Sequence, residues 1–198
     1  RQLFEGEGTA EVPYLIRNVQ DLAGLNSAVT RYAQSHEGDY FKMTQDIDLN
    51  YSENFSGVGI GSNTEFKGIF DGDGHTISRL KIHSANIGSD GVATTAGSKT
   101  HAGLFSRIGT TGVVKNVNIA ADADFIFYQT SGAIAGSVKG QIINCRNYAE
   151  VKGVDFYIGG IAGQLEASGT ISGCYNSGKV IAGGYGAGGI VGRAMGDK

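Results

Sequence analysis

The sequence predicts an all-β fold, a right-handed parallel β-helix with an N-terminal helical cap, from three observations. Gly supplies 33 of the 198 residues, more than twice its usual share of about 7%, and Pro occurs once. Short apolar segments recur in the second half of the chain, and each is too short to form a helix. A repeat of this size cannot bury its apolar side chains alone, so we expect successive repeats to stack in register.

The repeat is defined by four aligned Gly-apolar segments at residues 102–106, 132–136, 159–163 and 188–192. Their central residues are spaced 30, 27 and 29 positions apart, namely Leu104, Ile134, Ile161 and Ile190. Two further apolar segments follow within each repeat, at residues 142–147 and 150–151, for example, and again at 171–176 and 179–180. Each repeat is therefore predicted to contain three short strands.

In-register stacking of parallel strands at about 4.8 Å predicts which side chains lie above one another. Equivalent positions 29 residues apart are expected to pair Cys145 with Cys174, Asn147 with Asn176, and Glu150 with Lys179.

The chain reads as a single domain over residues 1–198. Residues 40–82 form early, less regular coils that include the turn sequence at 71–74 and apolar core candidates at Ile77, Leu80 and Ile82. Residues 84–100, rich in Ser, Gly, Ala and Thr, read as an insertion loop. Residues 101–198 hold the regular repeats, and the last one is truncated, so we expect a longer chain on the C-terminal side or a contact at this end.

Residues 1–39 form the N-terminal cap segment, with a helix predicted at about residues 19–36. Asn18 is a favourable N-cap, Asp21 suits the positive end of the helix dipole, and Gly38 ends the segment. The helix is expected to cover the first coil, which would otherwise expose apolar side chains and unpaired strand edges.

Charge and apolar patterning exclude several kinds of partner. Sixteen basic residues against nineteen acidic ones give a net charge of −3, which provides no basic face for nucleic acid. No apolar run is long enough for a transmembrane helix. We therefore predict no nucleic-acid partner and no transmembrane segment.

Two motifs that suggest a ligand site receive simpler structural interpretations. Residues 184–189 match G-x-G-x-x-G, but a dinucleotide site needs a following helix, and the repeat register predicts a strand there. The pairs Asp46/Asp48 and Asp71/Asp73 are typical of turns rather than of a calcium site, which needs six or more oxygen ligands. We predict no metal site and no cofactor.

The compact titratable cluster of His75 with Asp71 and Asp73 is the candidate for a carbohydrate-active β-helix lyase or hydrolase. Such an enzyme requires carboxylates, or a carboxylate and a base, that converge on one groove. A turn followed by an outward polar His explains the same residues, so no catalytic residue is assigned.

The two cysteines leave two readings open. Equivalent Cα atoms in adjacent coils lie within disulfide range, yet side chains that point inward in parallel favour free, buried thiols for Cys145 and Cys174.

Aromatic residues recur just before the later repeats. Tyr128, Tyr157 and Tyr185 are spaced 29 and 28 positions apart, so we expect a column near one turn. An exposed column would offer flat apolar faces with hydroxyl groups to a sugar or a partner protein. The alternative is an aromatic ladder that only stabilises the turn.

The segments AGLFS, GAIAG, GGIAG and GGIVG resemble the GLUG motif, and the early segments YFK, DIDL and FDGDGHTI resemble the start of such domains. Ser106 and Ala133 replace Gly of the motif, which are small changes. The resemblance implies a secreted or surface-anchored bacterial protein with a parallel β-helix, of the kind found in adhesin-like proteins and in accessory regions of surface peptidases that cleave immunoglobulin A. The family carries no agreed catalytic residues.

From these observations the predicted function is a non-enzymatic module at the bacterial cell surface or outside the cell, which acts in adhesion or in binding a host glycan or surface protein. A carbohydrate-active β-helix enzyme and a structural accessory domain of a surface peptidase are the alternatives.

Overall fold

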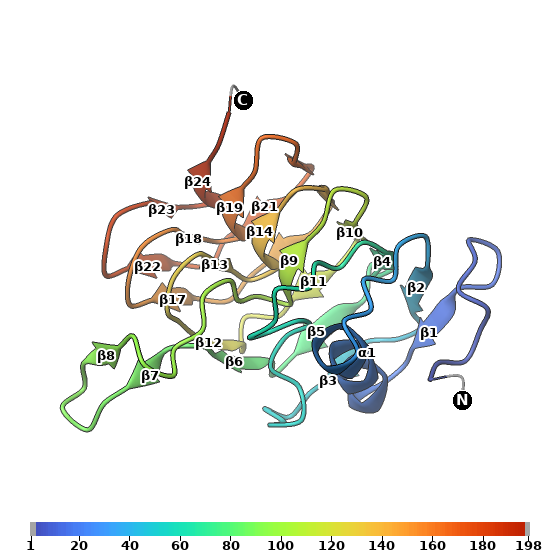
Figure 1. Cartoon of the computed structure of the whole chain (residues 1–198), viewed down its shortest axis with the longest axis horizontal. Helices are drawn as coiled ribbons and strands as arrows, with labels where there is room; N and C mark the ends of the chain where they lie inside the picture. The colour runs from blue at the N-terminus through green and yellow to red at the C-terminus, as the bar shows by residue number, and fades with distance from the viewer. Residues whose placement is uncertain (1–2, 197–198) are drawn as a thin grey trace.

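The repeated segments form a parallel β-solenoid in which each coil of the chain adds one strand to each of several sheets (Figure 1). The structure is a computed structural model and describes residues 3–196. All strand pairs of the solenoid sheets in this range are parallel, and they follow the order of the coils. The predicted parallel β-helix with a helix near the N-terminus is confirmed.

Five sheets run along the solenoid, in the order in which the chain meets them. Sheet I contains β1 Tyr14–Ile16, β2 Tyr40–Met43, β4 Ile69–Asp71, β10 Val113–Lys115, β15 Gln141–Ile143 and β20 Thr170–Ser172. Sheet II contains β3 Ile47–Asp48, β5 Thr76–Ser78, β11 Asn118–Ile119, β16 Arg146–Asn147 and β21 Tyr175–Asn176. Sheet III contains β6 Lys81–His83, β12 Asp124–Phe127, β17 Val151–Gly153 and β22 Val180–Ala182. Sheet IV contains β13 Ser131–Gly132, β18 Ile158–Gly159 and β23 Ala187–Gly188. Sheet V contains β9 Phe105–Ile108, β14 Ala135–Val138, β19 Ala162–Leu165 and β24 Val191–Ala194.

Each regular coil has five strands, such as β15 to β19, and the prediction of three was wrong. The segment at 142–147 is one apolar strip in the sequence, but Asn144 adopts a left-handed backbone with φ 52°. Asn tolerates this conformation better than most residues with a side chain. The turn divides the strip into β15 and β16. The Gly-apolar segment at 159–163 is likewise divided between β18 and β19.

The predicted vertical partners are confirmed by the strand register. Asn147 pairs with Asn176, and Val151 pairs with Val180. Cys145 and Cys174 directly precede the paired strands β16 and β21, so they lie beside each other. Glu150 and Lys179 precede β17 and β22 in the same way.

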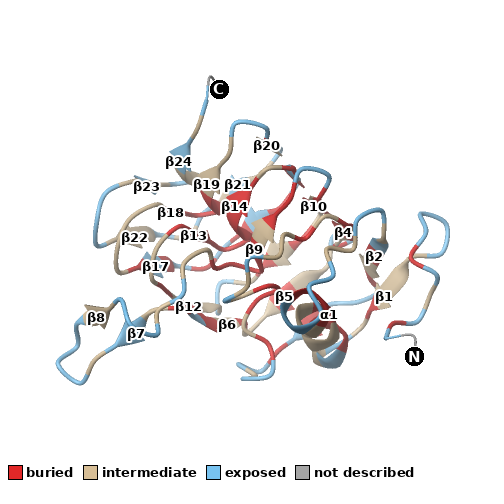
Figure 2. Cartoon of the chain, viewed as in Figure 1, coloured by how far each residue is buried: buried red, intermediate tan, exposed pale blue. Residues whose placement is uncertain are grey.

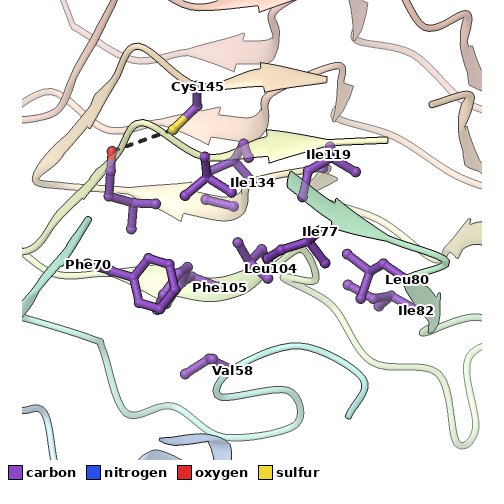
Figure 3. Packing of buried hydrophobic residues seen from close by; sticks show 14 of the residues in the cluster. Val58, Phe70, Ile77, Leu80, Ile82, Leu104, Phe105, Ile119, Ile134 and Cys145 are labelled. Carbon is purple, nitrogen blue, oxygen red and sulfur yellow. Dashed lines mark hydrogen bonds between the residues drawn. The ribbon is translucent and has the colours of Figure 1, made fainter. Parts of the chain in front are cut away.

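The core is a continuous apolar column inside the coils. Side chains from successive coils, among them Ile77, Leu104, Ile119 and Ile134, face one interior and are fully buried (Figure 3). Burial of such a side chain contributes about 1.5–3 kcal/mol relative to full exposure, so stacking supplies the stability that a single coil lacks.

Helix α1, Val19–Arg31, lies at the N-terminal end of the solenoid, between β1 and β2 in the chain (Figure 1). The Asn18 side chain accepts a hydrogen bond from the backbone N–H of Asp21 at 2.9 Å, as an N-cap does. The helix ends five residues before the predicted end at residue 36, because Ala33 has a left-handed φ of 50°. The Asn26 carboxamide oxygen accepts from Gly59 N at 2.9 Å and ties the helix to the coils beneath it.

The segment at 84–100 projects from the solenoid as a small antiparallel hairpin of β7 Asn86–Ile87 and β8 Ala93–Thr94 (Figure 1). Its strand residues are exposed or half-buried.

Burial decreases towards the coil of β20 to β24, where the buried colour gives way to tan and pale blue (Figure 2). Ile142 of β15 is fully buried, whereas its partner Ile171 in β20 is only partly buried. Ile161 is fully buried, whereas Ile190, one coil further on, is 37% exposed. The inner side chains of this coil thus lack the cover that each earlier coil receives from the next.

Candidate functional site

The structure brings two of the three predicted tyrosines together and leaves the third apart. Ser131 pairs with Ile158, which lies 27 positions on, and Ile158 pairs with Ala187, which lies 29 positions on. This register puts Tyr157 beside Thr130 rather than beside Tyr128. The rings of Tyr157 and Tyr185 do lie close, with centroids 5.5 Å apart.

Tyr128 instead lies at the start of the connection between β12 and β13. Its backbone N–H donates to the Ser84 hydroxyl at 3.1 Å, and its carbonyl accepts from Asp155 N at 3.0 Å. Its side chain is half-buried.

We call Phe156, Tyr157, Tyr185 and Arg193 the aromatic cluster. Phe156 and Tyr185 stack with an interplanar angle of 12° and centroids 5.3 Å apart. Phe156 meets Tyr157 edge to face at 4.8 Å. The cluster lies on the outside of the last two coils, and Tyr185 is 67% exposed.

The cluster also carries polar groups. The Arg193 guanidinium lies 4.9 Å from the centre of the Tyr157 ring, and its Nη1 donates to the Tyr157 hydroxyl at 3.2 Å. The neighbouring Tyr157 hydroxyl raises the pKa of Tyr185 above its usual value. Flat apolar rings next to hydroxyl and guanidinium donors can stack on a sugar or peptide and hydrogen-bond its edge.

The residues of the candidate catalytic cluster do not converge on one groove, since Asp73 and Asp71 line different ones. His75 Nδ1 lies 3.3 Å from the carboxylate of Asp46. The Asp71 carboxylate accepts from Asp73 N at 2.8 Å and from the Asn116 amide at 3.0 Å, which are contacts that shape the turn. The geometry therefore agrees with the interpretation as a turn.

In the part of the chain that the structure describes, the candidate metal and nucleotide motifs do not form the arrangement that such a site needs. No group of three or more His, Cys, Asp and Glu within residues 3–196 is placed to hold a metal ion. The G-x-G-x-x-G segment runs through β23 into β24 without a following helix, so the strand predicted from the repeat register is confirmed.

Cys145 and Cys174 are free thiols in this structure. Cys145 is fully buried in the core, where its Sγ lies 3.7 Å from the Val114 carbonyl oxygen (Figure 3). The neighbouring Cys145 thiol lowers the pKa of Cys174 to about 7, and the proximity of Cys174 together with burial raises the pKa of Cys145.

A cavity of about 600 Å³ lies at the N-terminal end and is lined by residues such as Tyr14, Ser35, His36 and Asp39. His36 Nδ1 lies 2.8 Å from the Asp39 carboxylate, and the imidazole packs edge-on against Phe41 at 5.1 Å. The His36 carbonyl accepts from Asp39 N at 2.9 Å, so this pair closes the turn before β2.

A second surface was missed by the sequence reasoning. A groove of about 480 Å³ follows the corner between sheets I and II and is lined by polar residues that include Asn144 and Arg146. The sequence does carry a signal for this surface, namely the alternation of side chains in and around β16. Since Cys145 and Asn147 point inward, Arg146 and Tyr148 must point outward.

These surfaces define a class of protein, a repeat-built parallel β-solenoid that presents an exposed aromatic cluster and a polar corner groove. Within that class the chain carries the GLUG motif, which matches residues 155–181. The match runs from the connection after β17 into β22, so the resemblance drawn from the repeated segments is confirmed in this part of the solenoid.

Two relatives align with most of this chain. One is "Halomucin" of Haloquadratum walsbyi, 26% identical over 84% of this chain and 2% of its own length. The other is a "Putative Gly-rich membrane protein" of Evansella cellulosilytica, 31% identical over 78% of this chain and 15% of its own length. The chain thus spans a small part of the relatives it matches.

The fold is similar to the crystal structure of "a putative immunoglobulin A1 protease" from Bacteroides ovatus. The TM-score is 0.60 at 22% identity, over 98% of this chain and 65% of that one. This likeness supports the solenoid fold alone. Within residues 3–196, no helix is long and apolar enough to span a membrane.

Proposed function

We propose that this chain is a non-enzymatic binding module of a secreted or surface-attached bacterial protein, and that it holds a host glycan or a host surface protein through the aromatic cluster. The observation that carries the proposal is the exposed Tyr185 ring, which stacks on Phe156 and meets the edge of Tyr157, the ring that the Arg193 guanidinium covers. An aromatic ring so exposed leaves its apolar face in water unless a ligand covers it.

A binding role agrees with the fold. A solenoid presents one repeated outer face over a long distance, which suits attachment to extended ligands. Surface attachment is supported by the membrane protein among the relatives, and adhesion follows if such a module meets a host surface.

A non-enzymatic role is favoured by how the carboxylates are used. The Asp48 carboxylate is bound by the Arg79 guanidinium, and the Asp71 carboxylate holds its own turn. General acid–base chemistry needs such groups free to converge on a substrate.

A structural accessory domain of a larger surface protein is the second candidate. It is favoured by the small share of each relative that the chain spans. As a spacer, the solenoid would need neither the aromatic cluster nor any ligand.

Binding of the whole chain to a glycan array and to immobilised host matrix proteins tests the proposal. Tyr185→Ala and Arg193→Ala are expected to weaken binding about tenfold or more, because each removes a stacking or hydrogen-bonding contact. Tyr32→Ala, an equally exposed tyrosine at the end of α1, is the matched control. Binding that survives both cluster variants in folded protein rejects this site, and the absence of any bound ligand favours the accessory role.

A further inference from the structure

The corner between sheets I and II forms a column of left-handed turns in four successive coils. Asp73, Asn116, Asn144 and Gly173 occupy the corner with φ of 51°, 56°, 52° and 63°. Only Gly and short polar residues adopt this conformation readily. The corner is thus a line of small or amide side chains, and it forms the floor of the groove of about 480 Å³, which we call the corner groove.

Some amides of the corner groove are held by the fold with their donors turned inward. The Asn116 Nδ2 group donates to the Asp71 carboxylate at 3.0 Å, and the Asn118 Nδ2 group donates to the Gly74 carbonyl at 2.9 Å. The carboxamide oxygens of both side chains are left as fixed acceptors at the groove, because the nitrogen of each amide is already anchored.

The donors of the corner groove lie one coil further on. The Arg146 guanidinium and the Asn144 amide are exposed at the groove, and neither side chain forms an ion pair or hydrogen bond with any residue from 3 to 196. Arg79, by contrast, is bound by Asp48 and Asn50. A guanidinium that no protein group engages keeps its whole planar fork of donors available.

Aromatic rings stand beside these donors. Tyr175 in β21 is the register partner of Arg146 in β16, so the two side chains are neighbours on the outer face of sheet II. The Tyr148 and Tyr175 rings are 5.8 Å apart and are 39% and 50% exposed. A flat ligand seated in the corner groove would therefore meet a ring face at one side.

We propose that the corner groove binds a neutral oligosaccharide. A sugar hydroxyl both donates and accepts, and the groove offers acceptors from Asn116, Asn118 and Asp73 together with donors from Asn144 and Arg146. Tyr175 supplies the apolar face on which the ring carbons of the sugar stack.

Charge selects the class of saccharide. The Asp73 carboxylate lies at one end of the groove, with Lys42 Nζ 3.7 Å away as its partner. An acidic saccharide would gain from Arg146 but would bring its own carboxylates near Asp73, whereas a neutral one satisfies both ends. This inference goes beyond the proposed function, since it assigns a second surface and a ligand class.

The test is an array of gluco-, manno- and galacto-oligosaccharides beside their uronic-acid counterparts, probed with the whole chain and followed by calorimetry with the bound members. Neutral members are expected to bind, and Arg146→Ala and Tyr175→Ala are each expected to weaken that binding about tenfold. Arg31→Ala and Tyr32→Ala, an exposed pair at the C-terminal end of α1, are the matched controls. Far-UV circular dichroism confirms that each variant is folded.

Three outcomes overturn the inference. Neutral oligosaccharides that fail to bind, or uronic-acid members that bind more tightly, reject the ligand class. Neutral binding that persists in folded Arg146→Ala and Tyr175→Ala rejects the groove. If that binding is instead lost in Tyr185→Ala, the ligand lies at the aromatic cluster, so the proposed function stands while this inference fails.

Discussion

Replacing Asn147 with Ala is expected to destabilise the solenoid by about 2–5 kcal/mol. The Asn147 side chain is fully buried, and its Nδ2 group donates to the Ala149 carbonyl at 2.8 Å and to Asn176 Oδ1 at 2.9 Å. Its Oδ1 accepts from Ala149 N at 3.1 Å. Ala149 is also fully buried, so the substitution leaves two backbone groups without a partner or water, at about 1–3 kcal/mol each.

Asn176→Ala is the matched control, one coil further on. Asn176 makes the same two local bonds, from its Nδ2 to the Gly178 carbonyl at 3.0 Å and from Gly178 N to its Oδ1 at 3.1 Å. Asn176 and Gly178 are only partly buried, so water can replace these bonds. The variant also removes one acceptor of the Asn147 Nδ2 group, which keeps its bond to the Ala149 carbonyl. The expected cost is therefore about 1–2 kcal/mol.

The assay is urea unfolding followed by far-UV circular dichroism, with hydrogen exchange at the Ala149 amide as a local measure. Exchange separates local opening from global unfolding, which matters because repeat proteins can lose cooperativity. A cost below about 1 kcal/mol for Asn147→Ala, or an equal cost for both variants, refutes the argument that burial makes the difference.

Three further predictions concern other parts of the chain. Gly163→Ala is expected to destabilise the folded protein by about 3 kcal/mol or more, because its Cβ would lie 2.2 Å from a backbone nitrogen of the preceding coil. In Gly189→Ala the new Cβ would have no atom within 4 Å, so its melting temperature should stay near that of the parent protein. Burial, aided by a nearby arginine, lowers the pKa of His101 to about 4 from 6.5, so the folded state disfavours the charged ring and stability is lost as pH falls from about 6.5 towards 4. Since the ring is partly exposed, we expect a loss of about 1–2 kcal/mol, and a pH profile that matches that of His101→Gln would contradict it. Because the pKa of Cys174 is about 7, we expect the rate of its alkylation by iodoacetamide to rise with a midpoint near that pH. Buried Cys145 should stay unmodified. Mass spectrometry that finds both cysteines equally labelled would contradict this difference in reactivity.

Much of the fold could be predicted because stacking repeats leave a strong periodic signal. The pairing of Asn147 with Asn176 follows from the repeat length. The core positions Ile77, Leu80 and Ile82 follow from alternation, and these three side chains are fully buried. Periodicity could not show the corner inside a strip, where the left-handed backbone of Asn144 creates a second strand.

The candidate site was predicted only in part, because coils differ in length. Tyr128 and Tyr157 are 29 positions apart, but the local coil at Ser131 and Ile158 spans 27. This difference shifts Tyr128 out of the row, and it lets Phe156 take the place against Tyr185.

The sequence by itself determined the solenoid, the N-terminal helix and the vertical partners, because each depends on spacing along the chain and on which side chains avoid water. Only the tertiary structure decided which surface residues become neighbours. The corner groove joins residues 73 to 173 across four coils, and its contents depend on the register of each strand. A slip of one residue turns a side chain to the opposite face of the sheet, so sites on this protein are set by register, while the fold is set by the repeat.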